Sequence, residues 1–326
     1  MTEFFSRLTP EWVLRAIEAG GFEPTGHCMM LRALENRVYD LRLVDGSHVV
    51  AKFYRPGRWS REAILEEHAF LQDLREAEIP VCAPLPFSNG ETLHTVEGIF
   101  YAVWPRTGGR PPEELGDEEI EILGRLLARI HSVGAVREAP HRSRLSAQTY
   151  ALEPLARIEE RGLLPGTYAE RYRQAVREAA SIYAECCKGV PVHRIHGDCQ
   201  LGNLLRGDDG WFFLDFDDLL TGPAVQDVWV LLPGRDTEAT RQRERLIDAY
   251  RQFRDFESAW LRLVEPLRAL RFIRYAGWIA HRWEDPAFPA SFPHFGTDAY
   301  WERETHDLEA QLEHIARTGQ APTACA

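Results

Sequence analysis

The first third of the chain alternates between the two spacings of apolar residues that predict helices and strands. Apolar positions that recur every three or four residues predict two helices, and these cover residues 10–20 and 61–77. Runs rich in β-branched and aromatic residues predict five strands, and these cover residues 37–44, 47–54, 81–87, 91–95 and 99–104. The first two strands flank Asp45-Gly46, a pair that favours a tight hairpin turn. This part of the chain is therefore predicted to be a small, β-rich lobe.

The second predicted helix carries a carboxylate, Glu67, inside its apolar face. A buried carboxylate is costly unless it has a cationic partner. Lys52, in the second strand of the hairpin, is the candidate for that partner. Glu66 is the competing assignment, because helical spacing alone does not separate two neighbouring residues.

A dense Pro/Gly stretch, residues 105–112, follows the β-rich part and is predicted to be a hinge. The remainder is mostly helical, with helices expected over residues 117–131, 165–187, 237–256, 257–283 and 299–315. The predicted fold class is therefore α+β with two lobes. The expected domains are a β-rich N-lobe (1–104), the hinge (105–112) and a larger helical C-lobe (113–326).

Composition limits the possible partners. A formal net charge of -12, with no basic tract, argues against a nucleic-acid-binding surface. No apolar stretch approaches the length that spans a bilayer, and the N-terminus lacks the features of a signal peptide. The six cysteines form neither a zinc-binding nor a disulfide pattern, and Cys199 reads as a small buried residue. We therefore expect a cytoplasmic monomer without nucleic-acid or membrane partners.

Lysine is rare in this chain. Lys and Arg total 38, yet the only lysines are Lys52 and Lys188. A lysine that persists in a strand of such a chain indicates a site that accepts a compact ammonium and not a planar guanidinium. Lys52 is therefore a candidate for binding phosphates. The alternative is a lysine whose stem lies along a strand edge with its charge in water.

Residues 196–218 (HGDCQLGNLLRGDDGWFFLDFDD) carry the pattern with the most chemical content. Asp198 is followed five residues later by Asn203, and Asp215 follows a short apolar run that predicts a buried strand. The Gly-bounded turn before that run would return Asp215 to Asn203. Amide and carboxylate oxygens suit Mg²⁺ shared with phosphates, and Asp198 could accept the proton of an attacking hydroxyl. The pattern indicates phosphoryl transfer. The alternative is a turn of solvated acids.

The chain resembles the protein-kinase-like fold in several features. These are a strand lysine, a helix glutamate, a hinge, a D-x4-N motif and a later Asp. His196-Gly197-Asp198, in place of His-Arg-Asp, and Leu126–His131 resemble its aminoglycoside and choline phosphotransferase branch. Further stretches resemble a group of bacterial stress-response kinases, and these are residues 35–39, 51–56, 64–68, 222–227, 265–269 and 285–289.

The resemblance implies an ATP- and Mg²⁺-dependent serine/threonine protein kinase of the cytoplasm that acts in stress response and cell survival. In this assignment Asp198 is the catalytic base. Asn203 and Asp215 are the metal ligands, and Asp215 also counts among the catalytic residues. Lys52, paired with Glu67, holds the nucleotide phosphates.

The resemblance also assigns nucleotide contacts. Ala33 and Asn36 would cover the phosphates, although residues 31–36 contain no glycine to allow close backbone approach. Pro105 has no N–H, so a hydrogen bond to the adenine would come from Arg106 or Thr107. The roles of Asp217 and Cys199 are left open by the sequence.

The acceptor is the least determined part of the prediction. The resemblance implies protein substrates with Ser/Thr hydroxyls, including the kinase itself. Asp227, however, follows closely after Asp215, which leaves no room for a long activation segment. Gly197 also removes the arginine that would bind an activating phosphate, so switching by phosphorylation there is not expected. A small alcohol such as an aminoglycoside or choline is the alternative acceptor, and a nucleotide-binding scaffold without activity is the third hypothesis.

Overall fold

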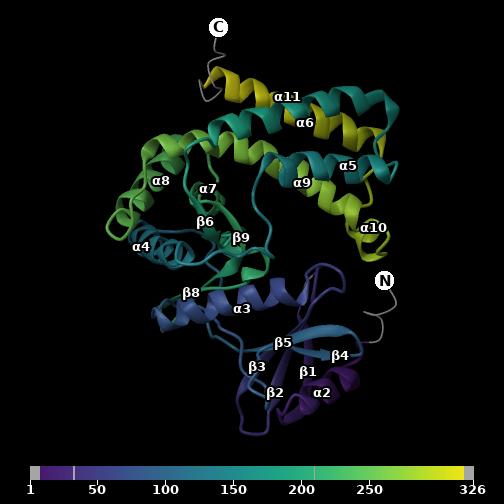
Figure 1. Cartoon of the computed structure of the whole chain (residues 1–326), viewed down its shortest axis with the longest axis vertical. Helices are drawn as coiled ribbons and strands as arrows, with labels where there is room; N and C mark the ends of the chain where they lie inside the picture. The colour runs from purple at the N-terminus through teal and green to yellow at the C-terminus, as the bar shows by residue number, and fades with distance from the viewer. Residues whose placement is uncertain (1–7, 32–33, 209, 319–326) are drawn as a thin grey trace. The chain divides into compact units, whose positions relative to one another are not determined.

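The computed structural model describes residues 8–31, 34–208 and 210–318 and divides into two compact units. Unit 1 comprises Met1–Arg142, Arg194–Leu219 and Val230–Arg254. Unit 2 comprises Ser143–His193, Leu220–Trp229 and Asp255–Ala326. Figure 1 shows the helices and strands of the two units with their labels. Among the described residues, no helix is both long and apolar enough to cross a membrane.

Unit 1 begins with helix α2 (Pro10–Ala19) and contains a five-stranded antiparallel sheet of order β1-β2-β3-β5-β4 (Figure 1). The strands are β1 (Pro24–Leu31), β2 (Arg37–Leu43), β3 (His48–Phe53), β4 (His94–Val96) and β5 (Ile99–Pro105). Helix α3 (Arg61–Glu76) begins at Ser60, whose side chain accepts the N–H of Ala63.

The alternation of side chains along β3 decides which residues meet which helix. Ala51 and Phe53 lie in the apolar core that contains Ile17 of α2. Tyr54 lies in a second core with Ile64 of α3. Because successive strand residues point to opposite faces, Lys52 shares the face of the sheet that α3 covers.

The structure corrects one strand prediction and contains one strand that the sequence did not predict. Residues 82–87 are not a strand, and Val81 makes only an isolated bridge to Phe213. Pro84 and Pro86 interrupt this segment, since proline cannot donate to a ladder. Strand β1 was not predicted, because most of its side chains are exposed or half-buried and its sequence shows no apolar alternation.

The rest of unit 1 holds helices α4 (Asp117–Gly134) and α8 (Thr237–Tyr250), which pack against each other, and a hairpin of strands β7 (Leu204–Gly207) and β8 (Gly210–Phe213). The helix predicted over residues 237–256 thus ends earlier, at Tyr250. Short strand β6 (Val192–Ile195) precedes the hairpin in the chain.

Unit 2 is mainly helical. Helix α9 (Val264–His281) packs against α5 (Glu153–Glu160), α6 (Gly166–Cys186) and α11 (Asp298–Arg317). The helix predicted from residue 257 instead begins with a 3-10 turn at Ser258–Leu263. Shorter elements are the π-helical turn Gln148–Leu152, β9 (Leu220–Pro223), α7 (Val225–Leu231) and α10 (Ala287–Ser291).

A glycine allows the close approach of α4 and α8, and this yields a stability prediction. A Cβ at Gly124 would lie 2.4 Å from the backbone oxygen of Leu246. Gly124→Ala should therefore lower the free energy of unfolding by about 1–3 kcal/mol, because the helices must move apart. Chemical denaturation measures this. Gly166→Ala on α6 is the control, since its Cβ would meet nothing within 4 Å. A Gly124→Ala protein as stable as the wild type would contradict the packing account.

Candidate active site

Lys52 is the centre of a buried group of charges in unit 1. Its side chain is 10% exposed, and its Nζ lies 3.2 Å from Oε1 of Glu67 and 3.2 Å from Oδ1 of Asp217. Oδ1 of Asp215 is 3.7 Å away. Burial lowers the pKa of Lys52, but Asp217 and Glu67 outweigh this effect and hold its pKa well above the ordinary value. Lys52 is therefore a fixed cation.

The helix partner of Lys52 is Glu67, which answers the choice that the sequence left open. Glu67 is 1% exposed, and its second oxygen is 2.8 Å from Nη2 of Arg142. Glu66 instead accepts the backbone N–H of His141 at 3.1 Å. Glu67 thus pairs with Lys52, and Glu66 holds the segment that carries Arg142.

Asp217 is the second buried anion at this site. One of its oxygens contacts Lys52, and Oδ2 lies 2.6 Å from Nη1 of Arg58 and 3.1 Å from Nδ2 of Asn36. Burial raises the pKa of Asp217, but Lys52, Arg58 and Arg142 outweigh it and hold that pKa below the ordinary value. We call Lys52, Arg58, Glu67, Arg142 and Asp217 the Lys52 cluster.

The loop after β6 holds the predicted base. Asp198 is half-buried, and its Oδ2 accepts a hydrogen bond from Nε2 of Gln200 at 2.9 Å. Nδ2 of Asn203 donates to the backbone oxygen of Asp198 at 2.8 Å. His196 supports the loop, since its ring lies 4.4 Å from that of Phe216 and its Nε2 is 2.8 Å from the oxygen of Leu214.

The β7–β8 hairpin brings the two predicted metal ligands to the same end. The N–H of Leu214 donates to the oxygen of Asn203 at 2.8 Å, so Asp215 follows directly beside Asn203. Asp215 has a left-handed backbone (φ 54°, ψ 67°), which is uncommon for a non-glycine residue and occurs often at functional sites. Its side chain is 57% exposed.

These two residues fit a hard divalent cation. The amide nitrogen of Asn203 is bonded to Asp198, which leaves the amide oxygen for a ligand, and Asp215 supplies an accessible carboxylate. Within the described residues, no group of three or more His, Cys, Asp or Glu side chains could hold a metal by itself. A cation here would therefore need further oxygen ligands from a bound molecule, as phosphates provide.

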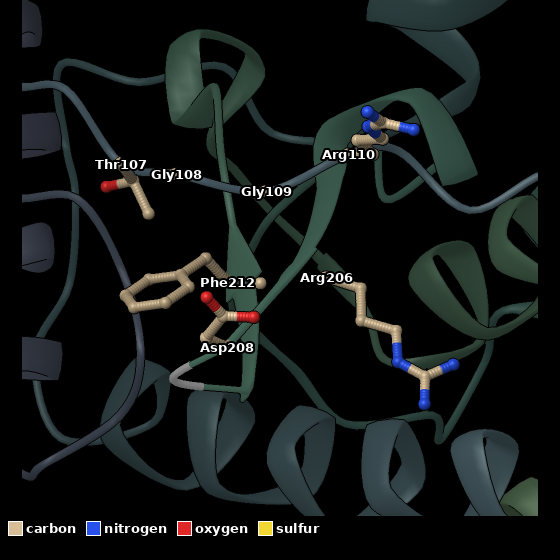
Figure 2. Close-up of a pocket in the computed structure, with 8 residues that line it drawn as sticks. Thr107, Gly108, Gly109, Arg110, Arg206, Asp208 and Phe212 are labelled. Atoms are coloured by element: carbon tan, nitrogen blue, oxygen red, sulfur yellow. The ribbon is translucent and has the colours of Figure 1, made fainter.

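A cavity of about 390 Å³ lies between residues 107–110 and the β7–β8 hairpin (Figure 2). Thr107, Asp208 and Phe212 line it, and Figure 2 shows the ring of Phe212 on the same side as Thr107. The lining segments are joined, because Arg110 and Arg206 exchange backbone hydrogen bonds of 3.0 and 2.9 Å. Phe212 supplies an aromatic ring to the lining of the cavity, beside the polar and charged side chains of Thr107, Arg110, Arg206 and Asp208.

The four residues predicted to contact the nucleotide differ in what the structure shows for them. The N–H of Arg106 already donates to the oxygen of His48, and its guanidinium contacts Asp40, so Arg106 does not offer the predicted hydrogen bond. Thr107 lines the cavity. Asn36 is 6% exposed, and its amide oxygen accepts the N–H of Arg55 while its nitrogen donates to Asp217. Ala33 lies outside the described residues.

Sequence reasoning missed three members of the Lys52 cluster. Asp217 was left without a role, since it stands in a run of acids. Arg58 and Arg142 were indistinguishable from the many other arginines of the chain. The apolar stripe of α3 gave a signal for Glu67, whereas no periodic pattern surrounds Arg142, which is buried in a loop after α4. Cys199 is fully buried, as expected.

The comparisons with known proteins agree with this geometry. The profile of the phosphotransferase enzyme family matches residues 31–264. Stress response kinase A of Escherichia coli (strain K12) is 40% identical over 302 residues, which cover 92% of each chain. The serine/threonine protein kinase RdoA of Salmonella typhimurium is 39% identical, with 92% of each chain covered.

Solved structures show the same fold. The amicoumacin kinase hAmiN, in complex with AMP-PNP, Ca²⁺ and Ami, aligns with a TM-score of 0.73 at 19% identity. The alignment covers 94% of this chain and 95% of hAmiN. This likeness confirms the predicted kinase-like fold, with its small antiparallel sheet and its helical part. The chain therefore belongs to the phosphotransferase enzyme family and is a kinase-like phosphotransferase.

Proposed function

We propose that this protein is an ATP- and Mg²⁺-dependent serine/threonine protein kinase that acts in the cytoplasm during bacterial stress response. The observation that carries the proposal is the assembly, within one unit, of a buried Lys52–Glu67 pair, the base candidate Asp198 and the adjacent oxygen donors Asn203 and Asp215. Phosphoryl transfer needs these parts, because its catalysis consists mainly of positioning and charge neutralisation.

Each residue has a definite task in this proposal. Lys52, held by Glu67, binds the nucleotide phosphates, while Thr107 and Phe212 border the cavity that receives the base. Asn203 and Asp215 hold the cation, which when bound neutralises and orients the phosphates. Asp198 accepts the proton of the acceptor hydroxyl, and the hydrogen bond that Nε2 of Gln200 donates to its Oδ2 orients the side chain.

Support for a protein acceptor comes from the relatives, one of which is named a serine/threonine protein kinase. The second candidate is a small alcohol, and a local feature favours it. From Asp215 the chain reaches α7 through a 3-10 turn and the four-residue strand β9, which leaves no long segment on which a peptide could lie. The amicoumacin kinase, which shares the fold, is named for a small molecule.

In the same proposal the protein works as a monomer, and it phosphorylates itself as well as protein substrates. Residues 105–112 would act as the hinge between a lobe at 1–104 and a lobe at 113–326. Their joining to the β7–β8 hairpin through Arg110 and Arg206 is consistent with a segment that borders the nucleotide.

The acceptor can be decided by a substrate panel. Purified protein should release ADP and label a general protein substrate such as casein, and it should label itself. A panel of small alcohols that includes aminoglycosides and choline is tested beside it. Saturable turnover of one small alcohol, without protein labelling, would replace the protein acceptor by the second candidate.

The same assay tests the base. Asp198→Asn keeps the size of the side chain and removes its basicity, so transfer should fall by about 10²–10⁴-fold. Asp248→Asn, which alters an exposed carboxylate of α8, is the control and should retain activity. Unreduced transfer by a folded Asp198→Asn protein would refute the assignment of the base.

Calorimetry tests the metal ligands. In the wild type, Mg²⁺ should strengthen the binding of a non-hydrolysable ATP analogue. In Asp215→Ala that strengthening should disappear, because the accessible carboxylate beside Asn203 is lost. The Asp248→Asn protein again serves as the control. If Mg²⁺ strengthens binding equally in Asp215→Ala, the cation is held elsewhere.

A further inference from the structure

We propose that Asp217 is a positioning residue of the phosphate site, which together with Glu67 holds Lys52 in place before a nucleotide binds. The inference rests on the proposed function in one respect, since it takes Lys52 as the residue that binds nucleotide phosphates. It adds a residue, two positions beyond Asp215, to which the sequence assigned no role.

Asp217 is held from several sides. It is 3% exposed, and groups of the chain engage both of its side-chain oxygens. Oδ1 contacts Lys52 on β3 at 3.2 Å. Oδ2 contacts Arg58, in the loop before α3, and Asn36, just before β2. Any rotation of this carboxylate would break contacts to three separate segments, so its position relative to Lys52 is fixed.

The three carboxylates around Lys52 therefore differ in what they can do. Glu67 and Asp217 are buried and lie 3.2 Å from Nζ. Asp215 lies 3.7 Å from Nζ, and its side chain is 57% exposed. A phosphate that reaches Lys52 would take the place of Asp215, which can turn towards a cation. The two buried anions would keep the ammonium in position during that exchange.

Arg142 joins the two buried anions into one unit. Its Nη2 donates to Oε2 of Glu67 at 2.8 Å, and its Nη1 donates to the backbone oxygen of Asp217 at 2.8 Å. Its Nε donates to the backbone oxygen of Ala63 at 2.7 Å, and its guanidinium lies over the ring of Trp59. Because the guanidinium is a rigid planar fork, it fixes the spacing between α3 and the turn that carries Asp217.

The same contacts argue against a different role for Asp217, that of a metal ligand. Its carboxylate faces the ammonium of Lys52 and the guanidinium of Arg58, at 3.2 and 2.6 Å. A divalent cation at this position would be repelled by both. Asp215, which is exposed and lies beside Asn203, is better placed to bind a cation.

The scarcity of lysine makes a direct test possible. Protein labelled with ¹⁵N at the lysine side chains gives only two ammonium groups, Lys52 and Lys188. Lys188 is 70% exposed and its ammonium pairs with Glu185, so it serves as the internal reference. NMR measures the rates at which the protons of these two ammonium groups exchange with water in the full chain without nucleotide.

Asp217→Asn should make the ammonium protons of Lys52 exchange with water faster and leave those of Lys188 unchanged. The reason is that the variant weakens one of the two buried contacts, each 3.2 Å from Nζ, that hold the ammonium in place. Asp73→Asn is the matched control, because Asp73, on α3, is likewise a carboxylate that pairs with arginines, in its case Arg194 and Arg137. Neither lysine should respond to it. Unchanged proton exchange at Lys52 in folded Asp217→Asn protein overturns the proposal.

Kinetics separate positioning from metal binding. Asp217→Asn should lower kcat/KM for ATP by about 10²-fold, as a misplaced binding group does, without raising the Mg²⁺ concentration that is needed. In a Lys52→Met background, Asp217→Asn should cause no further loss, because it acts through Lys52. A further loss there, or a raised Mg²⁺ requirement, contradicts the proposal.

A second variant covers the case in which Asp217→Asn does not fold. In Glu67→Gln, Asp217 should still hold Lys52. The ammonium protons of Lys52 should therefore exchange with water more slowly than those of Lys188. Equal exchange rates would refute the inference. None of these NMR results depends on the reaction. If the wild-type protein fails to transfer phosphate from ATP, the proposed function fails while the coupling of Lys52 and Asp217 is still measured.

Discussion

The burial of one lysine ammonium is the constraint on which the rest of the site depends. Lys52 is almost removed from water, and an ammonium in that position is stable only if anions replace its hydration. Glu67 and Asp217 supply them from two segments that lie far apart in the sequence. Two further cations, Arg58 and Arg142, then compensate those anions. The sheet, α3 and the turn after β8 are thereby connected through charge as well as through apolar packing.

This arrangement has a consequence for regulation. In kinases that are switched by phosphorylation, an added phosphate pairs with arginines and orders the catalytic parts. Here Arg142, a residue of the chain itself, already holds Glu67 against Lys52 and also holds the backbone of Asp217. The lysine–glutamate pair is thus formed without a modification. What remains movable is Asp215, whose exposed carboxylate and left-handed backbone set it apart from the buried anions.

The sequence predicted the parts of the fold that follow from local periodicity. The helix over residues 61–77 and the hairpin around Asp45-Gly46 have clear spacing and clear turn signals, and both are present. Strand β1 could not be predicted, because a mostly exposed edge strand shows no apolar alternation. The segment after Val81 was misread as a strand, since its apolar residues stand between prolines that prevent a ladder.

The candidate site likewise contains some residues that the sequence predicted and others that it did not. Lys52 and Glu67 were found because each breaks a local pattern, a lysine in an Arg-rich chain and an acid in an apolar stripe. Asp217 and Arg142 break no such pattern. Their roles arise from contacts between residues 75 positions apart or more, which only the folded chain defines. The engaged N–H of Arg106 is likewise a property of strand pairing and not of composition.

We infer that the Lys52 cluster selects the shape of the ammonium and not only its charge. Lys52→Arg tests it most directly, because it keeps the positive charge but introduces a planar fork between Glu67, Asp217 and the rings of Tyr54 and Trp104. Steady-state transfer from ATP is measured for both proteins, with circular dichroism to establish that the variant is folded. The account predicts that kcat/KM falls by about 10²-fold or more. Turnover equal to that of the wild type would contradict it.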